Sequence, residues 1–168
     1  MYKKLEKCLK RHKKKERISN QKKTVILGSG LGDYAEKIQI EKIVKYTDIE
    51  DFPVSTVQGH KGQFVFGYVK DVPVVLMQGR VHYYEGYSMQ DVVLPTRLMG
   101  MMGAKKILLT NAAGGVNPSF RPGDFMLITD HITTAVPSPL IGPNIEELGT
   151  RFPDMSEVYS KNTSENHP

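Results

Sequence analysis

The 168-residue sequence predicts an α/β fold in which helices flank a mixed central β-sheet. Three apolar runs of strand length, at residues 24–27, 72–77 and 105–110, lie along the chain with helical segments between them. Each run leads directly into a turn that contains glycine. Strands that alternate with helices and end in glycine turns are typical of α/β sheets.

The first segment, residues 1–23, is predicted to be a basic amphipathic helix. It contains eleven Lys and Arg residues against two acids, whereas the whole chain has a net charge of only +5. Leu5, Cys8, Leu9 and His12 fall at helical spacing, which leaves a Lys-rich face for solvent. Binding to nucleic acid or to a membrane surface is the weaker alternative, because such charge runs are usually solvated faces.

The overall composition fits an ordinary soluble globular protein, with 39% apolar and 24% charged residues. No apolar run approaches the length of a membrane span, and no signal-like segment follows the basic residues. The single cysteine, Cys8, excludes an internal disulfide, so we expect a reducing, cytoplasmic location.

The first predicted strand, residues 24–27, continues into Gly28-Ser29-Gly30-Leu31-Gly32 and then a short helix over residues 33–37. In this order, backbone N–H groups and a helix start can face an anion. Asp33 stands where a dinucleotide fingerprint needs its third glycine, and a Walker loop would need Gly-Lys-Ser/Thr. The turn therefore indicates a simple anion site or merely a tight connection.

Residues 64–70 and 72–77 predict a β-hairpin that turns at Lys70-Asp71. A helix follows, with Ser88 as its N-cap and Asp91 at the capping-box position, and Pro95 is expected to kink or end its first part.

Directly after the hairpin, Arg80 and His82 are spaced so that both side chains project to one face of an extended chain. A guanidinium can hold two oxygens of an anion at once, and an imidazole can add a donor or exchange a proton. Tyr83, Tyr84 and Tyr87 add aromatic surface beside this charge. The alternative is a plain surface ion pair between Arg80 and Glu85.

The third apolar run, residues 105–110, is predicted to be a strand buried on both faces, followed by the small side chains of residues 111–115. Residues 125–132 predict a further strand. In open α/β sheets, ligands gather beyond the carboxyl ends of the strands. The three turns are therefore expected to form one site.

Together these segments resemble the trimeric, low-molecular-mass class of purine nucleoside phosphorylases over residues 24–160. The motifs occur in the family's order: Gly28-Ser29-Gly30-Leu31-Gly32, Gly59-His60-Lys61-Gly62, residues 77–87, residues 110–115 and Arg151-Phe152-Pro153-Asp154-Met155-Ser156. Methylthioadenosine phosphorylases are less similar, because they carry an Arg-His-Gly-Arg-like element where this chain has Gly59-His60-Lys61-Gly62.

The resemblance implies reversible phosphorolysis, in which inorganic phosphate attacks the anomeric carbon of a purine nucleoside or deoxynucleoside. The products are the free base and ribose or deoxyribose 1-phosphate. It implies no cofactor and no metal, with phosphate as co-substrate, and a homotrimer in which Phe152 reaches a neighbouring subunit's site.

The resemblance also assigns roles to individual residues. The implied catalytic residues are Arg80, His82 and Glu85, with Glu85 orienting His82 or the phosphate network. The implied phosphate ligands are Ser29, His60, Arg80, His82 and the backbone N–H of Ala112. The implied nucleoside contacts are Tyr84, Ala112, Ala113, Gly114 and Phe152.

The sequence departs from the family near its end. Residues 161–168 are polar and do not match, and the family's later segments, which carry a purine-binding Glu and Asn, have no counterpart here. We therefore expect this chain alone to be weakly active or inactive. The alternatives are a remnant that binds phosphate without turnover and a methylthioadenosine phosphorylase-like enzyme.

Overall fold

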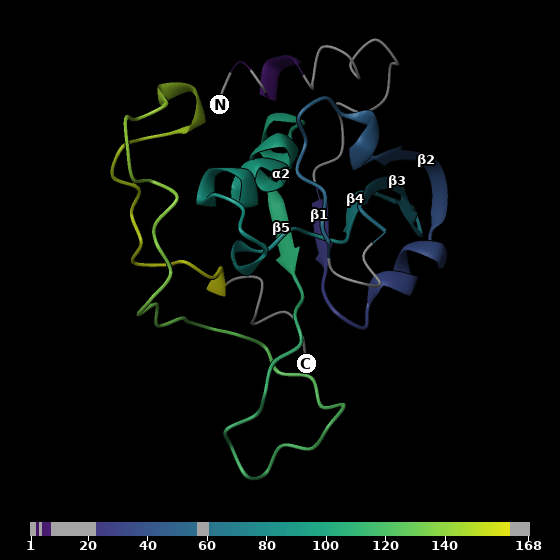
Figure 1. Ribbon diagram of the computed structural model, residues 1–168. Helices are drawn as coiled ribbons and strands as arrows, with labels where there is room; N and C mark the ends of the chain where they lie inside the picture. Colours follow the sequence, from purple (N-terminus) through teal and green to yellow (C-terminus); the bar gives the residue numbers. More distant parts are fainter. Residues whose placement is uncertain (1–2, 4, 8–22, 57–60, 162–168) are drawn as a thin grey trace. The chain divides into compact units, whose positions relative to one another are not determined.

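A computed structural model describes residues 3, 5–7, 23–56 and 61–161, so most of the predicted N-terminal helix, with Cys8, lies outside the described residues. The chain divides into two units, Met1–Ala112 and Ala113–Pro168 (Figure 1). The expected boundaries at residues 23/24 and 160/161 stay a prediction. No helix among the described residues is long and apolar enough to cross a membrane.

The first unit contains a five-stranded sheet with the strand order β2-β3-β4-β1-β5. β1 (Lys23–Leu27) runs parallel to both β4 (Val72–Gln78) and β5 (Lys106–Leu109), whereas β2 (Gln39–Lys45) and β3 (Gln63–Val69) pair antiparallel. The predicted mixed sheet is therefore confirmed. β2 was not predicted from the sequence.

The hairpin of β3 and β4 forms as expected, with Val69 opposite Val72 across the turn. Lys70 adopts a positive φ of 52°, which a non-glycine residue tolerates only in such a tight connection.

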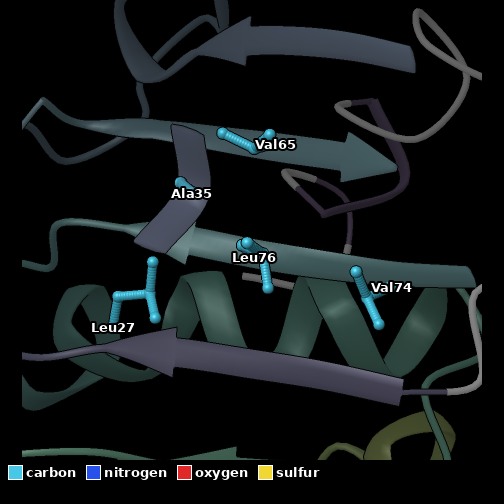
Figure 2. Close-up of a cluster of buried hydrophobic side chains, with 5 residues drawn as sticks. All are labelled: Leu27, Ala35, Val65, Val74 and Leu76. Carbon is cyan, nitrogen blue, oxygen red and sulfur yellow. The ribbon is translucent and has the colours of Figure 1, made fainter. Parts of the chain in front are cut away.

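The core of this unit covers both faces of the sheet. On one face, Leu27, Val65 and Leu76 pack with Ala35 of the 3₁₀ helix η2 (Gly32–Glu36). Figure 2 shows Ala35 in front of β3 and β4, with α2 (Met89–Met101) behind the sheet. The predicted helix over residues 33–37 is thus present, but as a 3₁₀ helix.

Helix α2 begins as predicted, because the Ser88 side chain accepts a hydrogen bond from the backbone N–H of Asp91. Of the two effects expected of Pro95, a kink or an end of the first part of the helix, the end is wrong, since α2 continues to Met101. Pro95 is buried with Leu94, Leu98 and Met99, so tertiary packing compensates for the missing backbone donor.

Two predictions about strands are wrong. β5 is not buried on both faces: all four of its residues are exposed, and Leu108 and Leu109 are each 58% exposed. The reason is its position at the edge of the sheet, where only β1 pairs with it among the described residues. Residues 125–132, in the second unit, form no strand, and Phe125 and Ile132 are each 93% exposed.

Candidate active site

The predicted site lies at the carboxyl edge of the three parallel strands. Leu27 of β1 is level with Gln78 of β4, and Ile26 is level with Leu109 of β5. Because parallel strands end at the same edge, the turns that follow them are neighbours. The structure therefore brings together the segments that begin at Gly28, Gly79 and Thr110.

Thr110 joins the first and third of these turns. Its Oγ1 accepts a hydrogen bond from the Gly28 N–H (2.8 Å) and donates to the Ile26 carbonyl (3.0 Å). A Cβ on residue 28 would lie 2.2 Å from the Thr110 carbonyl oxygen, so only glycine fits there. The close approach of these two backbones explains the glycine at the end of β1.

Arg80 joins the second turn to the third, since its Nη1 donates to the Thr110 carbonyl oxygen at 2.9 Å. The guanidinium is half-buried at this edge. Ala112, whose backbone N–H is a predicted phosphate ligand, follows two residues after Thr110 and is exposed. Arg80 thus contacts the segment that leads into Ala112.

Ser29 lies at the tip of the first turn. The Leu31 N–H donates to the Gly28 carbonyl at 3.1 Å, and Gly30 has a φ of 82°, which is the geometry of a type II turn. Ser29 is exposed at the second position of this turn. It shares the sheet edge with Arg80, because Gly28 and Arg80 both contact Thr110.

A buried tyrosine that was not predicted from the sequence binds the backbone just before Arg80. The Tyr46 hydroxyl donates to the carbonyl of Gly79 at 2.8 Å, and its ring packs against Phe52 and Phe64. Burial raises the pKa of the Tyr46 phenol, so it stays protonated and remains a donor.

His82 is held by Glu85 in a local capping box at the start of the 3₁₀ helix η4 (Tyr83–Glu85). Glu85 Oε1 accepts from the His82 backbone N–H at 2.7 Å and lies 2.8 Å from His82 Nδ1. The Glu85 side chain is only 3% exposed. The expectation that Glu85 orients His82 agrees with this geometry, and the catalytic roles of both residues stay predictions.

The other oxygen of Glu85 is bound by residues that sequence reasoning missed. Oε2 accepts from the backbone N–H of Thr56 (2.7 Å), from the Thr56 hydroxyl (2.9 Å) and from the Ser55 hydroxyl (3.2 Å). Burial alone would raise the pKa of the Glu85 carboxyl, but the hydrogen bonds from Thr56 and His82 lower it to about 2. Glu85 is therefore a carboxylate at neutral pH.

The ring of Tyr84 stacks on the imidazole of His82, with centroids 4.8 Å apart and an interplanar angle of 15°. Tyr84 is otherwise open to solvent, with 76% of the residue exposed. A ligand in solvent can thus contact the Tyr84 ring.

The contacts described above do not involve four of the predicted site residues. His60 lies outside the described residues. Ala113, Gly114 and Phe152 belong to the second unit. Phe152 is 85% exposed, with the Arg151 guanidinium 5.9 Å from its ring centroid. It is therefore not a core residue of that unit.

Within the described part of the chain, no group of three or more His, Cys, Asp or Glu side chains is arranged to hold a metal ion. The segments that follow the parallel strands carry a glycine turn, a guanidinium and an imidazole. Such groups suit an oxyanion.

Comparison with known proteins identifies the family. A model of the Phosphorylase superfamily matches residues 22–165. This chain belongs to the phosphorylase superfamily. Its sequence is 57% identical over 137 residues to purine nucleoside phosphorylase 1 of Geobacillus stearothermophilus, covering 82% of this chain and 50% of that protein.

Solved structures agree with this placement. Isoform 2 of the Schistosoma mansoni purine nucleoside phosphorylase, in complex with cytosine and ribose-1-phosphate, gives a TM-score of 0.87 at 39% identity over 98% of this chain and 58% of that one. A schistosoma purine nucleoside phosphorylase in complex with hypoxanthine gives 0.86 at 37% identity over 97% of this chain and 58% of that one.

The resemblance to purine nucleoside phosphorylases that the motifs predicted is confirmed by these relatives. The chain spans about half the length of the curated relatives it matches.

Proposed function

We propose that this chain carries the phosphate-binding and ribose-binding side of a purine nucleoside phosphorylase active site. The observation that supports this most directly is the contact of Arg80 with Thr110, which joins the segment after β4 to the glycine turn after β1. The chain thereby places a guanidinium beside a backbone turn that bears a hydroxyl.

In the proposed reaction, an oxygen of inorganic phosphate forms a bond to the anomeric carbon as the bond to the purine nitrogen breaks. Arg80 binds the phosphate, and the Ser29 hydroxyl and the Ala112 N–H fix its orientation. The phosphate charge stabilises the cationic sugar of the transition state. The electron pair of the broken bond stays with the purine, which takes up a proton.

His82 donates to or accepts from the phosphate, and Glu85 holds its ring. We propose that Tyr84, which stacks on His82, contacts the ribose beside the phosphate. We also propose that Ala113 and Gly114 face the purine and that the protein is a cytoplasmic homotrimer to which Phe152 contributes. The resemblance supports these last points, and light scattering of the purified protein tests the trimer.

The deciding experiment measures release of hypoxanthine from inosine with and without added phosphate. Release by this chain should be weak and should require phosphate, and Arg80→Lys should lose both the release and the binding of phosphate, because Lys lacks the planar fork of Arg. Arg97→Lys is the matched control, since Arg97 is a half-buried arginine of α2 that contacts Gln90.

Phosphate-induced thermal stabilisation is measured on the same proteins. Stabilisation without base release would favour the phosphate-binding remnant. If the wild-type chain shows neither release nor stabilisation, the proposed function is wrong for this chain.

A further inference from the structure

Two neighbouring residues, Ser55 and Thr56, contact the carboxylate of Glu85 in the proposed site. Both residues bind Oε2 of Glu85, while Oε1 of the same carboxylate contacts the backbone N–H and the ring of His82. The carboxylate therefore joins two segments that are separated by 29 residues in sequence.

Five donor atoms surround this carboxylate, counting the ring nitrogen of His82. If Glu85 were protonated, its own O–H would point at groups that are themselves donors. This is unfavourable on either oxygen, because each oxygen already accepts hydrogen bonds. The network thus selects the ionised form of Glu85, and an ionised carboxylate can only accept hydrogen bonds.

The ring of His82 must then donate from Nδ1 to Glu85. In a neutral imidazole, a proton on Nδ1 leaves Nε2 without one, so Nε2 is an acceptor. If the donors on Oε2 were lost, the carboxylate would no longer be held with Oε1 against Nδ1, and the preference of the ring for a proton on Nδ1 would weaken. The donors on Oε2 therefore determine which nitrogen of His82 can accept a proton.

We propose that Thr56 is a positioning residue that, through Glu85, holds His82 in the tautomer with its proton on Nδ1. Thr56 provides two of the three donors on Oε2, at 2.7 and 2.9 Å, and Ser55 provides the third at 3.2 Å. In the proposed phosphorolysis, on which this kinetic role rests, His82 would then present Nε2 as an acceptor for the hydroxyl of hydrogen phosphate.

The same segment offers a matched control. The Tyr87 hydroxyl donates to the Val54 carbonyl at 2.6 Å, so Tyr87 also holds this segment against the turn that contains Glu85, but without contacting the carboxylate. Tyr87→Phe removes this contact and a longer one, in which the Val54 N–H donates to the same hydroxyl at 3.3 Å. Thr56→Val removes the hydroxyl that binds Glu85 and keeps the shape of the side chain.

Nuclear magnetic resonance of protein labelled with ¹⁵N-histidine reports which ring nitrogen is protonated, and His82→Gln assigns the signal among the five histidines. We expect the Nδ1–H tautomer in the wild type and in Tyr87→Phe. Thr56→Val should shift the tautomer ratio about tenfold towards Nε2–H, the effect of one hydrogen bond to a charged group. Thr56→Ser should restore the wild-type signal.

The kinetic arm uses phosphate-dependent release of hypoxanthine. Thr56→Val should lower kcat/KM for phosphate about tenfold, with Thr56→Ser and Tyr87→Phe near the wild type. Ser55→Ala provides a second, smaller perturbation if Thr56→Val does not fold. A tautomer unchanged in both Thr56→Val and Ser55→Ala would overturn the proposal, as would an equal change in Tyr87→Phe.

The two arms separate this proposal from the proposed function. A shifted tautomer in a chain that releases no base supports the role of Thr56 and counts against the phosphorylase activity of the chain. Base release by the wild type, with a tautomer that the variants leave unchanged, supports the phosphorylase activity and counts against the role of Thr56.

Discussion

The two units of this chain have similar apolar side chains but bury them very differently. In the first unit, Leu76 of β4 and Val65 of β3 are almost completely buried in one core cluster on the sheet. In the second unit, Val116 is 97% exposed, and Phe125 and Ile132 are nearly as exposed. The difference teaches that an apolar run is buried only where neighbouring strands provide a surface to pack on.

Hydrogen bonding shows the same contrast. The first unit has contacts between residues far apart in sequence, such as Gly28 with Thr110. Side-chain contacts in the second unit include many local ones, for example Ser156 with Asp154 and Ser119 with Asn117. Local turn chemistry shapes such a segment, but it does not by itself create a core.

The largest expected difference between the units concerns leucine. Leu76→Ala should destabilise the chain by about 2–5 kcal/mol, because it leaves a cavity in the sheet core. Leu127→Ala, at an exposed position of the second unit, should change the free energy of unfolding by less than about 0.5 kcal/mol. Urea unfolding followed by circular dichroism measures both, and equal effects would break the comparison.

Acid should act mainly through the first unit. The pKa of Glu85 is lowered from 4.5 to about 2, so its stabilisation is complete above pH 4.5 and is lost as pH falls towards 2. The amount is up to about 3 kcal/mol.

Glu85→Gln should remove this pH dependence between 4.5 and 2. In the second unit, the pKa of Asp154 is also lowered, by hydrogen bonds from Ser156, but the group is exposed and Asp154→Asn should change the profile little. Urea titrations at several pH values test both variants. An unchanged profile in Glu85→Gln would show that the buried carboxylate contributes nothing.

Replacing a glycine by alanine should destabilise the first unit more than the second. Gly28→Ala should cost about 1–3 kcal/mol, because the new Cβ would meet the Thr110 carbonyl at 2.2 Å. Gly114→Ala, in the second unit, has nothing within 4 Å of the new Cβ and should be nearly neutral. Thermal unfolding of the two variants provides the measurement, and a neutral Gly28→Ala would mean that the β1 and β5 ends are not in contact.

The smallest expected effect concerns serine. Ser88→Ala removes the N-cap of α2 and should cost about 1 kcal/mol. Ser156→Ala removes a contact to Asp154 within an exposed turn and should cost less than about 0.5 kcal/mol. The midpoints of urea unfolding of the two variants provide the measurement. A lower midpoint for Ser156→Ala than for Ser88→Ala would contradict this order.

The sequence predicted those elements whose signals are local. β1, β3 and β4 are short apolar runs bounded by turns, and α2 has a serine cap. β2 was missed because Gln39–Lys45 is mostly polar or exposed, with only Val44 buried, as is common for an edge strand. The expected strand over residues 125–132 was wrong, because strand propensity does not provide a pairing partner.

The site shows the same limit. Arg80, His82 and Glu85 were predicted from one short segment, and the structure holds them close to the sheet edge. Tyr46 and Thr56 were missed, because each acts through a contact with a residue 29 or more positions away. The only signal for Thr56 in the sequence is the Ser-Thr pair shortly before the glycine-flanked histidine. That pair gains a role only through its contact with the buried Glu85 carboxylate, which the sequence does not reveal.

Thr110 is the last residue that joins the exposed edge strand β5 to β1, because its backbone N–H donates to the Ile26 carbonyl. The carbonyl oxygen of the same residue accepts a hydrogen bond from Arg80. An anion that immobilises the guanidinium would therefore also slow fraying of the strand end. Hydrogen exchange at the Thr110 amide should slow when phosphate is added, which makes one backbone amide a reporter of occupancy at the arginine.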